Sequence, residues 1–183
     1  LLIIMQDFVH LHVHTQYSLL DGQASVARLV DKAMKNGMKG IAVTDHGNMF
    51  GIKEFTNYVN KKNSGPKGEV KDLKKRIAGI EAGTIECEDK EAEIAACKAK
   101  IVEAENKLFK PIIGCEMYVA RRTMDLKEGK PDQSGYHLIV LAKNETGYHN
   151  LIKLVSHAWT RGYYMRPRTD RNKLKKYHEG LII

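Results

Sequence analysis

Histidines alternate with apolar residues in the stretch that decides the fold, Phe8-Val9-His10-Leu11-His12-Val13-His14-Thr15. On a β-strand, successive side chains point to opposite faces, so the three histidines share one face and the apolar residues share the other. Neutral imidazole is a common ligand for zinc, manganese and iron, and histidines two positions apart on a strand reach the same ion. The stretch therefore predicts a strand that carries a metal site. The alternative is a polar strand face whose histidines form local hydrogen bonds.

A second polar cluster follows the next predicted strand. Ser25 is the expected N-cap of a helix that runs to about Asn36 and stops at Gly37. The apolar run 39–44 then predicts a short buried strand, which ends in Thr44-Asp45-His46-Gly47-Asn48. Ligand sites of parallel α/β proteins lie at the carboxyl ends of the strands, so we expect His46 to meet His14 at one edge of a sheet. A helix over 52–62 closes the second βα unit.

The composition changes after a cluster of helix breakers at 63–68. From about Val70 to Leu108 the sequence is charged, and apolar residues recur every three or four positions on both sides of a break at Gly83. This pattern predicts an antiparallel helical hairpin. We interpret residues 64–108 as an insertion that acts as a solvated spacer; docking of a partner or contact with DNA is the alternative.

Two further strands each contribute a candidate ligand. Glu116 lies in the middle of an apolar strand predicted over 112–119, where a carboxylate is costly unless it is paired or bound to a cation. The alternative partner of Glu116 is a buried arginine or lysine. His137 begins the next strand, 136–142. A helix that turns Trp159 largely inward, a short helix from Asp170 to Tyr177 and a strand at 181–183 complete the predicted elements.

Four imidazoles and two carboxylates are thus expected to meet: His12, His14, Asp21, His46, Glu116 and His137. A catalytic zinc takes three protein ligands and keeps an open position, so this set is too large for one ion. We expect two or three divalent metals, zinc or manganese. Clustered ions suit hydrolysis of a phosphoester because they lower the pKa of bound water and stabilise the attacking and leaving oxygens. No serine lies in a nucleophile elbow, so nucleophilic serine catalysis is poorly supported.

Charge and composition limit the partners and the compartment. Lysine and arginine number 30 against 22 aspartate and glutamate, and the net charge of +8 favours polyanions such as nucleic acid. The loop 161–168 mixes basic and aromatic residues, which is typical of contacts with phosphates and bases, although an ordinary connecting loop is equally compatible. No apolar run reaches membrane-spanning length, and three cysteines without zinc-ribbon spacing fit a reducing compartment. We expect a cytoplasmic protein with no membrane partner. The candidate DNA contacts are Arg121, Arg122, Arg161, Arg166 and Arg168.

These residues resemble a known family. His-Val-His-Thr at 12–15, Asp-Gly at 21–22, Thr-Asp-His-Gly-Asn at 44–48, Gly-Cys-Glu at 114–116 and Tyr-His-Leu at 136–138 look like the polymerase and histidinol phosphatase (PHP) domain. The resemblance is closer to the form of this domain at the N-terminus of bacterial DNA polymerase III alpha subunits. It covers nearly all of the chain except the hairpin.

The resemblance implies an α/β fold, a seven-stranded (β/α) barrel that holds a trinuclear metal site. Its catalytic residues would be His12, His14, His46 and Glu116, with Glu116 as a bridging carboxylate and Asp21 and His137 as further ligands. His10 and Asp45 would lie beside the ligands without binding metal. The implied function is DNA replication by a DNA-directed DNA polymerase, with 3′–5′ exonuclease proofreading by this domain. The alternatives are a metal-stabilised scaffold without turnover and a standalone phosphatase similar to histidinol phosphatase.

The resemblance also predicts what surrounds the chain. Residues 5–183 would form the N-terminal part of the domain; independently of the resemblance, Met5 is a candidate for the natural start, because it follows four apolar residues at the beginning of the sequence. Further barrel strands, further metal ligands and the polymerase core would then follow Ile183. DNA, the rest of the polymerase chain, and the proofreading and clamp subunits of the replication machinery are the implied partners.

Overall fold

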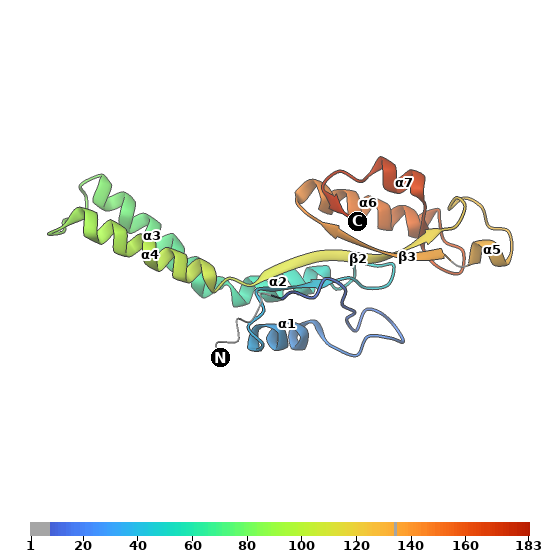
Figure 1. The fold of residues 1–183 in the computed structure, drawn as a ribbon, viewed down its shortest axis with the longest axis horizontal. Coiled ribbons are helices and arrows are strands. Elements are labelled where there is room, and N and C mark those ends of the chain that lie inside the picture. Colours follow the sequence, from blue (N-terminus) through green and yellow to red (C-terminus); the bar gives the residue numbers. More distant parts are fainter. Residues whose placement is uncertain (1–7, 134) are drawn as a thin grey trace, which may run out of the picture. The chain divides into compact units, whose positions relative to one another are not determined.

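A computed structural model describes residues 8–133 and 135–183 of the chain (Figure 1). Within these residues the chain forms seven helices and five strands. It divides into two compact units, one comprising residues 57–110 and the other the described residues on either side of them. The candidate ligands all belong to the second of these, which we call the sheet unit.

The sheet unit is built on a mixed β-sheet. Its strands are β1 (Gly40–Val43), β2 (Lys110–Ala120), β3 (Gly135–Ala142), β4 (Arg168–Thr169) and β5 (Leu181–Ile182). The order is β1-β2-β3-β5, and β4 pairs with β2. β3 runs antiparallel to both β2 and β5, whereas β4 runs parallel to β2. The chain is therefore an α/β protein, and a closed barrel stays a prediction.

The expectation of parallel strands is wrong for β3. Parallel neighbours need a crossover connection, which is usually a long helix. Between β2 and β3 the described residues form one helix, the four-residue α5 (Lys130–Gln133), which is too short for a crossover, so β3 returns beside β2 in the opposite direction. Consequently the first residues of β3 lie next to the last residues of β2.

The histidine stretch is not a regular strand, which corrects the sequence prediction. It runs beside β1: Ala42 N–H donates to the His10 carbonyl and Thr44 N–H donates to the Val13 carbonyl, both at 2.9 Å. The two accepting carbonyls are three residues apart in the histidine stretch, whereas the two donors are two residues apart at β1. The histidine stretch therefore carries one extra residue, as a β-bulge does. The bulge breaks the alternation that would have placed all three histidines on one face.

Capping residues fix the ends of three helices of the sheet unit. Ser25 caps α1 (Val26–Lys35), Asn144 caps α6 (Glu145–Thr160) and Asp170 caps α7 (Arg171–Lys176), each through a side-chain oxygen that accepts a backbone N–H of the first turn. The predicted α1, including its stop at Gly37 with φ 76°, is confirmed.

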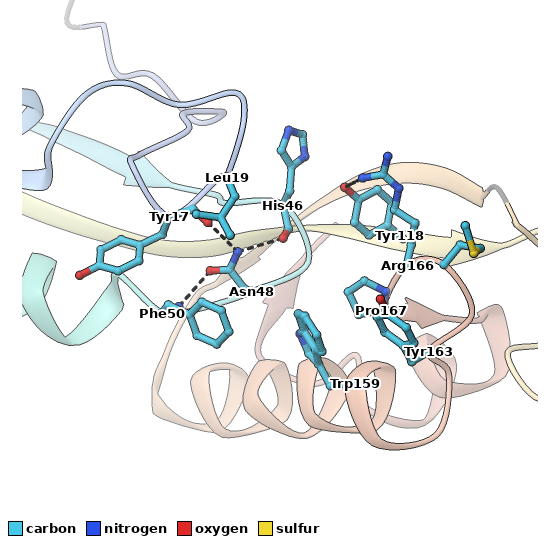
Figure 2. Close-up of a pocket in the computed structure, with 11 residues that line it drawn as sticks. Tyr17, Leu19, His46, Asn48, Phe50, Tyr118, Trp159, Tyr163, Arg166 and Pro167 are labelled. Carbon is cyan, nitrogen blue, oxygen red and sulfur yellow. Dashed lines mark hydrogen bonds between the residues drawn. The ribbon is translucent and has the colours of Figure 1, made fainter.

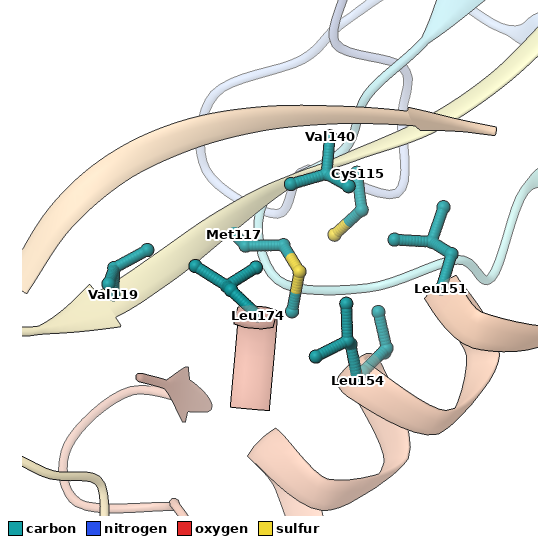
Figure 3. Packing of buried hydrophobic residues seen from close by; sticks show 8 residues of the cluster. Cys115, Met117, Val119, Val140, Leu151, Leu154 and Leu174 are labelled. Carbon is teal, nitrogen blue, oxygen red and sulfur yellow. The ribbon is translucent and has the colours of Figure 1, made fainter. Parts of the chain in front are cut away.

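Helix α6 covers one face of β2 and β3 and forms the core with them (Figure 3). The buried cluster consists of Cys115, Met117, Val119, Val140, Leu151, Leu154, Val155 and Leu174. Odd-numbered β2 residues from 115 to 119 face this core, so the even-numbered Glu116 and Tyr118 face the other side of the sheet. The prediction that Trp159 turns largely inward is wrong, because 42% of the residue is exposed.

Residues 57–110 form the helical unit. It holds the last part of α2 (Ile52–Lys62), then α3 (Ser64–Glu81) and α4 (Lys90–Asn106), which pack against each other as the predicted hairpin. The turn falls at Gly83, with φ 73°. Helix α3 begins at Ser64, within the cluster 63–68 that we interpreted as helix breakers, because the first turn of a helix tolerates Pro66. At the base of the hairpin, the Asn63 side chain bonds both backbone groups of Phe109, at 2.8 and 2.9 Å.

Across the part of the chain that the structure describes, none of the helices combines the length and the apolar character needed to span a membrane.

Candidate metal centre

Glu116 is the centre of the histidine cluster. Its side chain is buried, with 3% of the residue exposed. Gly47 N–H donates to the Glu116 carbonyl at 2.9 Å and Glu116 N–H donates to the Asp45 carbonyl at 3.1 Å, so His46 and Glu116 form a parallel bridge. The segment that follows β1 therefore brings His46 beside Glu116.

Four imidazoles converge on this one carboxylate. Oε2 of Glu116 lies 2.7 Å from His12 Nε2, 2.9 Å from His14 Nε2 and 3.5 Å from His46 Nδ1. His137 Nδ1 contacts the other oxygen, Oε1. His137 pairs with Tyr118, two residues beyond Glu116 on the same face, which explains how the antiparallel β3 delivers it.

Asp21 extends the cluster from the loop before α1. Its Oδ2 lies 2.8 Å from His46 Nε2, on the other ring nitrogen from the one that faces Glu116. Of the two candidate carboxylate ligands, Asp21 is the more exposed: 57% of its side chain is accessible, against 4% for Glu116. The structure thus brings together all six predicted ligands, in three overlapping groups: His12, His14 and Glu116; His14, Asp21 and His46; and His46, Glu116 and His137.

The electrostatics of the cluster favour the protonation states that bind metal. Burial by itself would raise the pKa of Glu116, but the hydrogen bond from His12 and the charges of His46 and His137 outweigh burial, and the pKa is lowered. Burial and the neighbouring His46 lower the pKa of His14. Metal ligands must be ionised carboxylates and neutral imidazoles, so both shifts suit coordination.

A chain of hydrogen bonds orients His14, and the sequence analysis missed its middle member, Ser18. The Ser18 hydroxyl donates to Asp45 Oδ1 at 2.7 Å and lies 2.8 Å from His14 Nδ1. Because its single proton goes to the carboxylate, Ser18 accepts the proton of Nδ1, and the lone pair of Nε2 then faces Glu116. Asp45, which we had placed beside the ligands, is buried and also accepts from Thr15. A small hydroxyl residue four positions after a ligand histidine was the available signal.

Tyr118 is a second residue that the sequence analysis missed. Its ring meets that of His137 edge to face at 4.9 Å and lies roughly parallel to that of His46, with centroids 6.2 Å apart. Its hydroxyl accepts a hydrogen bond from Arg166 Nη1 at 2.9 Å. Tyr118 therefore joins two candidate ligands to the loop that precedes β4.

His10 lies apart from the cluster, because of the bulge. Its ring contacts Phe8 at 4.7 Å, and it lines a cavity with residues of α1 such as Leu29 and Lys32. His10 belongs to none of the three ligand groups, and no hydrogen bond joins it to a ligand within residues 8–133 and 135–183.

The predicted DNA contact of Arg168 is wrong, because its side chain is fully buried and donates to four backbone carbonyls. Arg122 is paired with Asp132 and Glu128, and Arg161 lies near Asp125. Arg121 lies over the ring of Tyr136. Arg166 is exposed and lies over the ring of Tyr118, 5.1 Å from its centroid.

The residues present fit a metal cluster. His46 Nδ1 is buried and has no hydrogen-bond partner in the described part of the chain, although it points toward Glu116. The nitrogens of His12 and His14 lie 3.0 Å apart and approach the same oxygen. Imidazole and carboxylate are suitable ligands for divalent transition metals, and a cation would satisfy the nitrogen left without a partner.

Fold and site together define an α/β protein with a mixed sheet and a cluster of histidines and carboxylates that could hold metal ions. The sequence model of the PHP domain matches residues 10–183, and the chain belongs to this family. The chain is 42% identical over 178 residues to DNA polymerase III subunit alpha of Borreliella burgdorferi and 40% identical over 177 residues to that of Treponema pallidum; in both cases the match covers 96% of this chain and 11% of the relative. With the same protein of Aquifex aeolicus it shares 34% over 183 residues, which cover 97% of this chain and 12% of the relative.

The chain is thus a PHP domain homologous to the N-terminal region of DNA polymerase III alpha subunits. It spans about a tenth of the length of the relatives it matches.

Proposed function

We propose that the six clustered residues bind two or three divalent ions, zinc or manganese, and that the domain hydrolyses phosphoesters of DNA. The observation that supports this most directly is the convergence of four imidazoles on the buried Glu116. Glu116 presents one oxygen to His12 and His14 and the other to His137, as a carboxylate that bridges two ions would. His14 and His46 each belong to two of the three ligand groups, which is the basis for proposing a third ion.

The residues of the chain would divide the work as follows. Bound ions would supply a deprotonated water at neutral pH and neutralise charge on the phosphate. The ions next to the reacting phosphate would be bound by His12, His14, His46 and Glu116. Asp21 and His137 would be further ligands at the two ends of the cluster. Ser18 and Asp45 would keep His14 in the tautomer that binds metal.

The relatives support a place in DNA replication, since they are named as alpha subunits of DNA polymerase III. We propose that the substrate is the 3′ end of a DNA strand, and that the domain proofreads as a 3′–5′ exonuclease within a cytoplasmic polymerase. Its partners would be DNA, the rest of the polymerase, and the proofreading and clamp subunits. The mixed sheet would be part of a (β/α) barrel completed by further strands.

Metal content and hydrolysis together test this proposal. Elemental analysis should find divalent metal in the unaltered protein and much less in the double variant His12→Ala, His14→Ala, since both residues contact Glu116. The unaltered protein should release nucleotides from a DNA strand that carries a 3′ mismatch, and the double variant should not. Metal without hydrolysis would support the scaffold alternative, and hydrolysis of histidinol phosphate but not DNA would support the standalone phosphatase. Equal metal content in both proteins would refute the ligand assignment.

Replacing Ser18 by alanine should weaken metal binding about 10–100-fold, the usual cost of losing a residue that orients a ligand histidine. The physical reason is that His14 Nδ1 loses its acceptor, so the other tautomer becomes accessible. Competition against a fluorescent chelator measures the affinity. Ser25→Ala is the matched control, because it also removes a hydroxyl, at the N-cap of α1, without touching the cluster. Equal metal affinities of the two variants would contradict the role given to Ser18.

We also propose that residues 64–108 are a helical-hairpin insertion that the metal site does not need. A Gly-Ser linker between Asn63 and Phe109 should leave metal content unchanged and cost at most about 1–2 kcal/mol of stability. The linker keeps the two hydrogen bonds between these residues, and α3 and α4 pack on each other. Elemental analysis and urea unfolding measure the two effects. Loss of the metal would show that the hairpin supports the site and is not a spacer.

A further inference from the structure

An aromatic pocket adjoins the histidine cluster. It has a volume of ≈ 220 Å³ and shares His46 with the cluster. Figure 2 shows Phe50, Trp159 and Tyr163 on the side nearer α6, with His46, Tyr118 and Arg166 on the opposite side. We propose that this pocket binds an unpaired base of the DNA strand whose phosphate lies at the metal cluster, and that Arg166 binds a phosphate of the same strand. This inference rests on the proposed function.

The exposure of the aromatic side chains indicates a binding surface. Phe50 is 65% exposed, Tyr163 49% and Trp159 42%. Exposed apolar groups that cluster around one pocket are typical of an interaction site, whereas scattered ones are not. Other large exposed apolar residues line the same pocket: Leu19 and Met165.

The rings form a platform suited to a planar partner. Tyr163 stacks on Trp159 with centroids 5.7 Å apart and an angle of 22° between the planes, and Phe50 lies 6.2 Å from Trp159 on another side. Trp159 Nε1 donates to the Gly47 carbonyl at 2.8 Å, which fixes the indole next to His46. Bases stack on such rings whatever their sequence. The volume is below the roughly 300–1,000 Å³ of pockets that hold drug-sized ligands, so it suits one base.

Arg166 supplies the charge that a nucleic acid needs. Its guanidinium is held by the Tyr118 hydroxyl and ring, yet no carboxylate pairs with it among the residues that the structure describes. Arg122 and Arg161, in contrast, both lie against acidic residues. A positioned guanidinium with free donors binds phosphate oxygens, and it lies on the Tyr118 side, next to the cluster that would hold the scissile phosphate. An unpaired base fits because a paired one is already stacked and enclosed in its duplex.

Binding of a short single-stranded oligothymidylate tests the inference, with a strand of equal length made of abasic nucleotides as its partner probe. Both carry the same phosphates, so charge alone cannot separate them. With the 183-residue chain, in chelator so that no strand is cleaved, we expect the base-containing strand to bind about tenfold more tightly. Trp159 is the only tryptophan, and only the base-containing strand should quench its fluorescence.

Variants of Tyr163 complete the test. Tyr163→Ala should abolish the preference for the base-containing strand, and Tyr163→Phe should retain it because the ring remains. Arg166→Gln should lower the affinity for both strands by the same factor, because both carry the same phosphates. Equal affinities of the two strands for the unaltered chain, or an unchanged preference in Tyr163→Ala, would overturn the inference. Hydrolysis is a separate readout: its absence refutes the proposed exonuclease without altering these affinities.

Discussion

Replacing Glu116 by glutamine should lower metal affinity by more than about 100-fold, beyond the effect of residues that only orient a ligand. Glutamine keeps the size of the side chain, so the buried position stays filled. The amide removes the negative charge, however, and presents one oxygen where Glu116 presents two, each in contact with different histidines. The loss should appear as absence of metal after dialysis, measured by elemental analysis.

Glu54→Gln is the matched control for this change. Glu54 is also a carboxylate of the sheet unit, but it accepts a hydrogen bond from the Tyr17 hydroxyl at 2.8 Å and belongs to none of the three ligand groups found among the described residues. The metal affinity of Asp21→Asn should fall between those of the two variants, since Asp21 is exposed and its carboxylate pairs with His46 at the edge of the cluster. Full metal content in Glu116→Gln, with loss in Asp21→Asn, would place the metal at the edge of the cluster and contradict a bridging Glu116.

Local rules of sequence predicted much of the fold. Ser25 caps α1 and Asp170 begins α7, as expected, because a short polar side chain can accept the unpaired N–H groups of a first turn. Glu116 was identifiable because a carboxylate within an apolar strand needs a partner. Both rules depend on a few neighbouring residues, so the sequence alone was enough.

Features that depend on pairing between distant segments could not be predicted in this way. The extra residue between His10 and Val13 is visible only against the two-step spacing of Ala42 and Thr44 on β1. The direction of β3 depends on a connection that lacks a crossover helix. Both errors affected the reasoning about the site. The six candidate ligands nevertheless lie together, because His137 reaches Glu116 from the start of an antiparallel strand as it would from the end of a parallel one.

The role of Arg168 shows the same limit for charged side chains. A basic residue in a basic-aromatic loop predicts contact with phosphate, but burial decides whether its charge is available. Arg168 donates to the carbonyls of Gly162, Met124, Leu126 and Asp132 at 2.8–3.0 Å. It therefore connects the loop after β2 to the loop before β4 from inside the protein. Of the arginines in the loop 161–168, Arg166 alone is both exposed and without an acidic partner in the part of the chain that the structure describes.

Replacing Arg168 by methionine should lower the free energy of unfolding by about 3 kcal/mol or more, because several buried carbonyls lose their donors at once. Arg168→Lys should recover only part of this loss, since a single ammonium cannot match the planar fork of donors. Urea unfolding measures both variants. Arg171→Met, at an exposed position of α7, is the control and should change stability by no more than about 0.5 kcal/mol. If Arg168→Met were as stable as this control, the buried guanidinium would not hold the two loops together, and the pocket that includes Arg166 and Tyr163 would need another support.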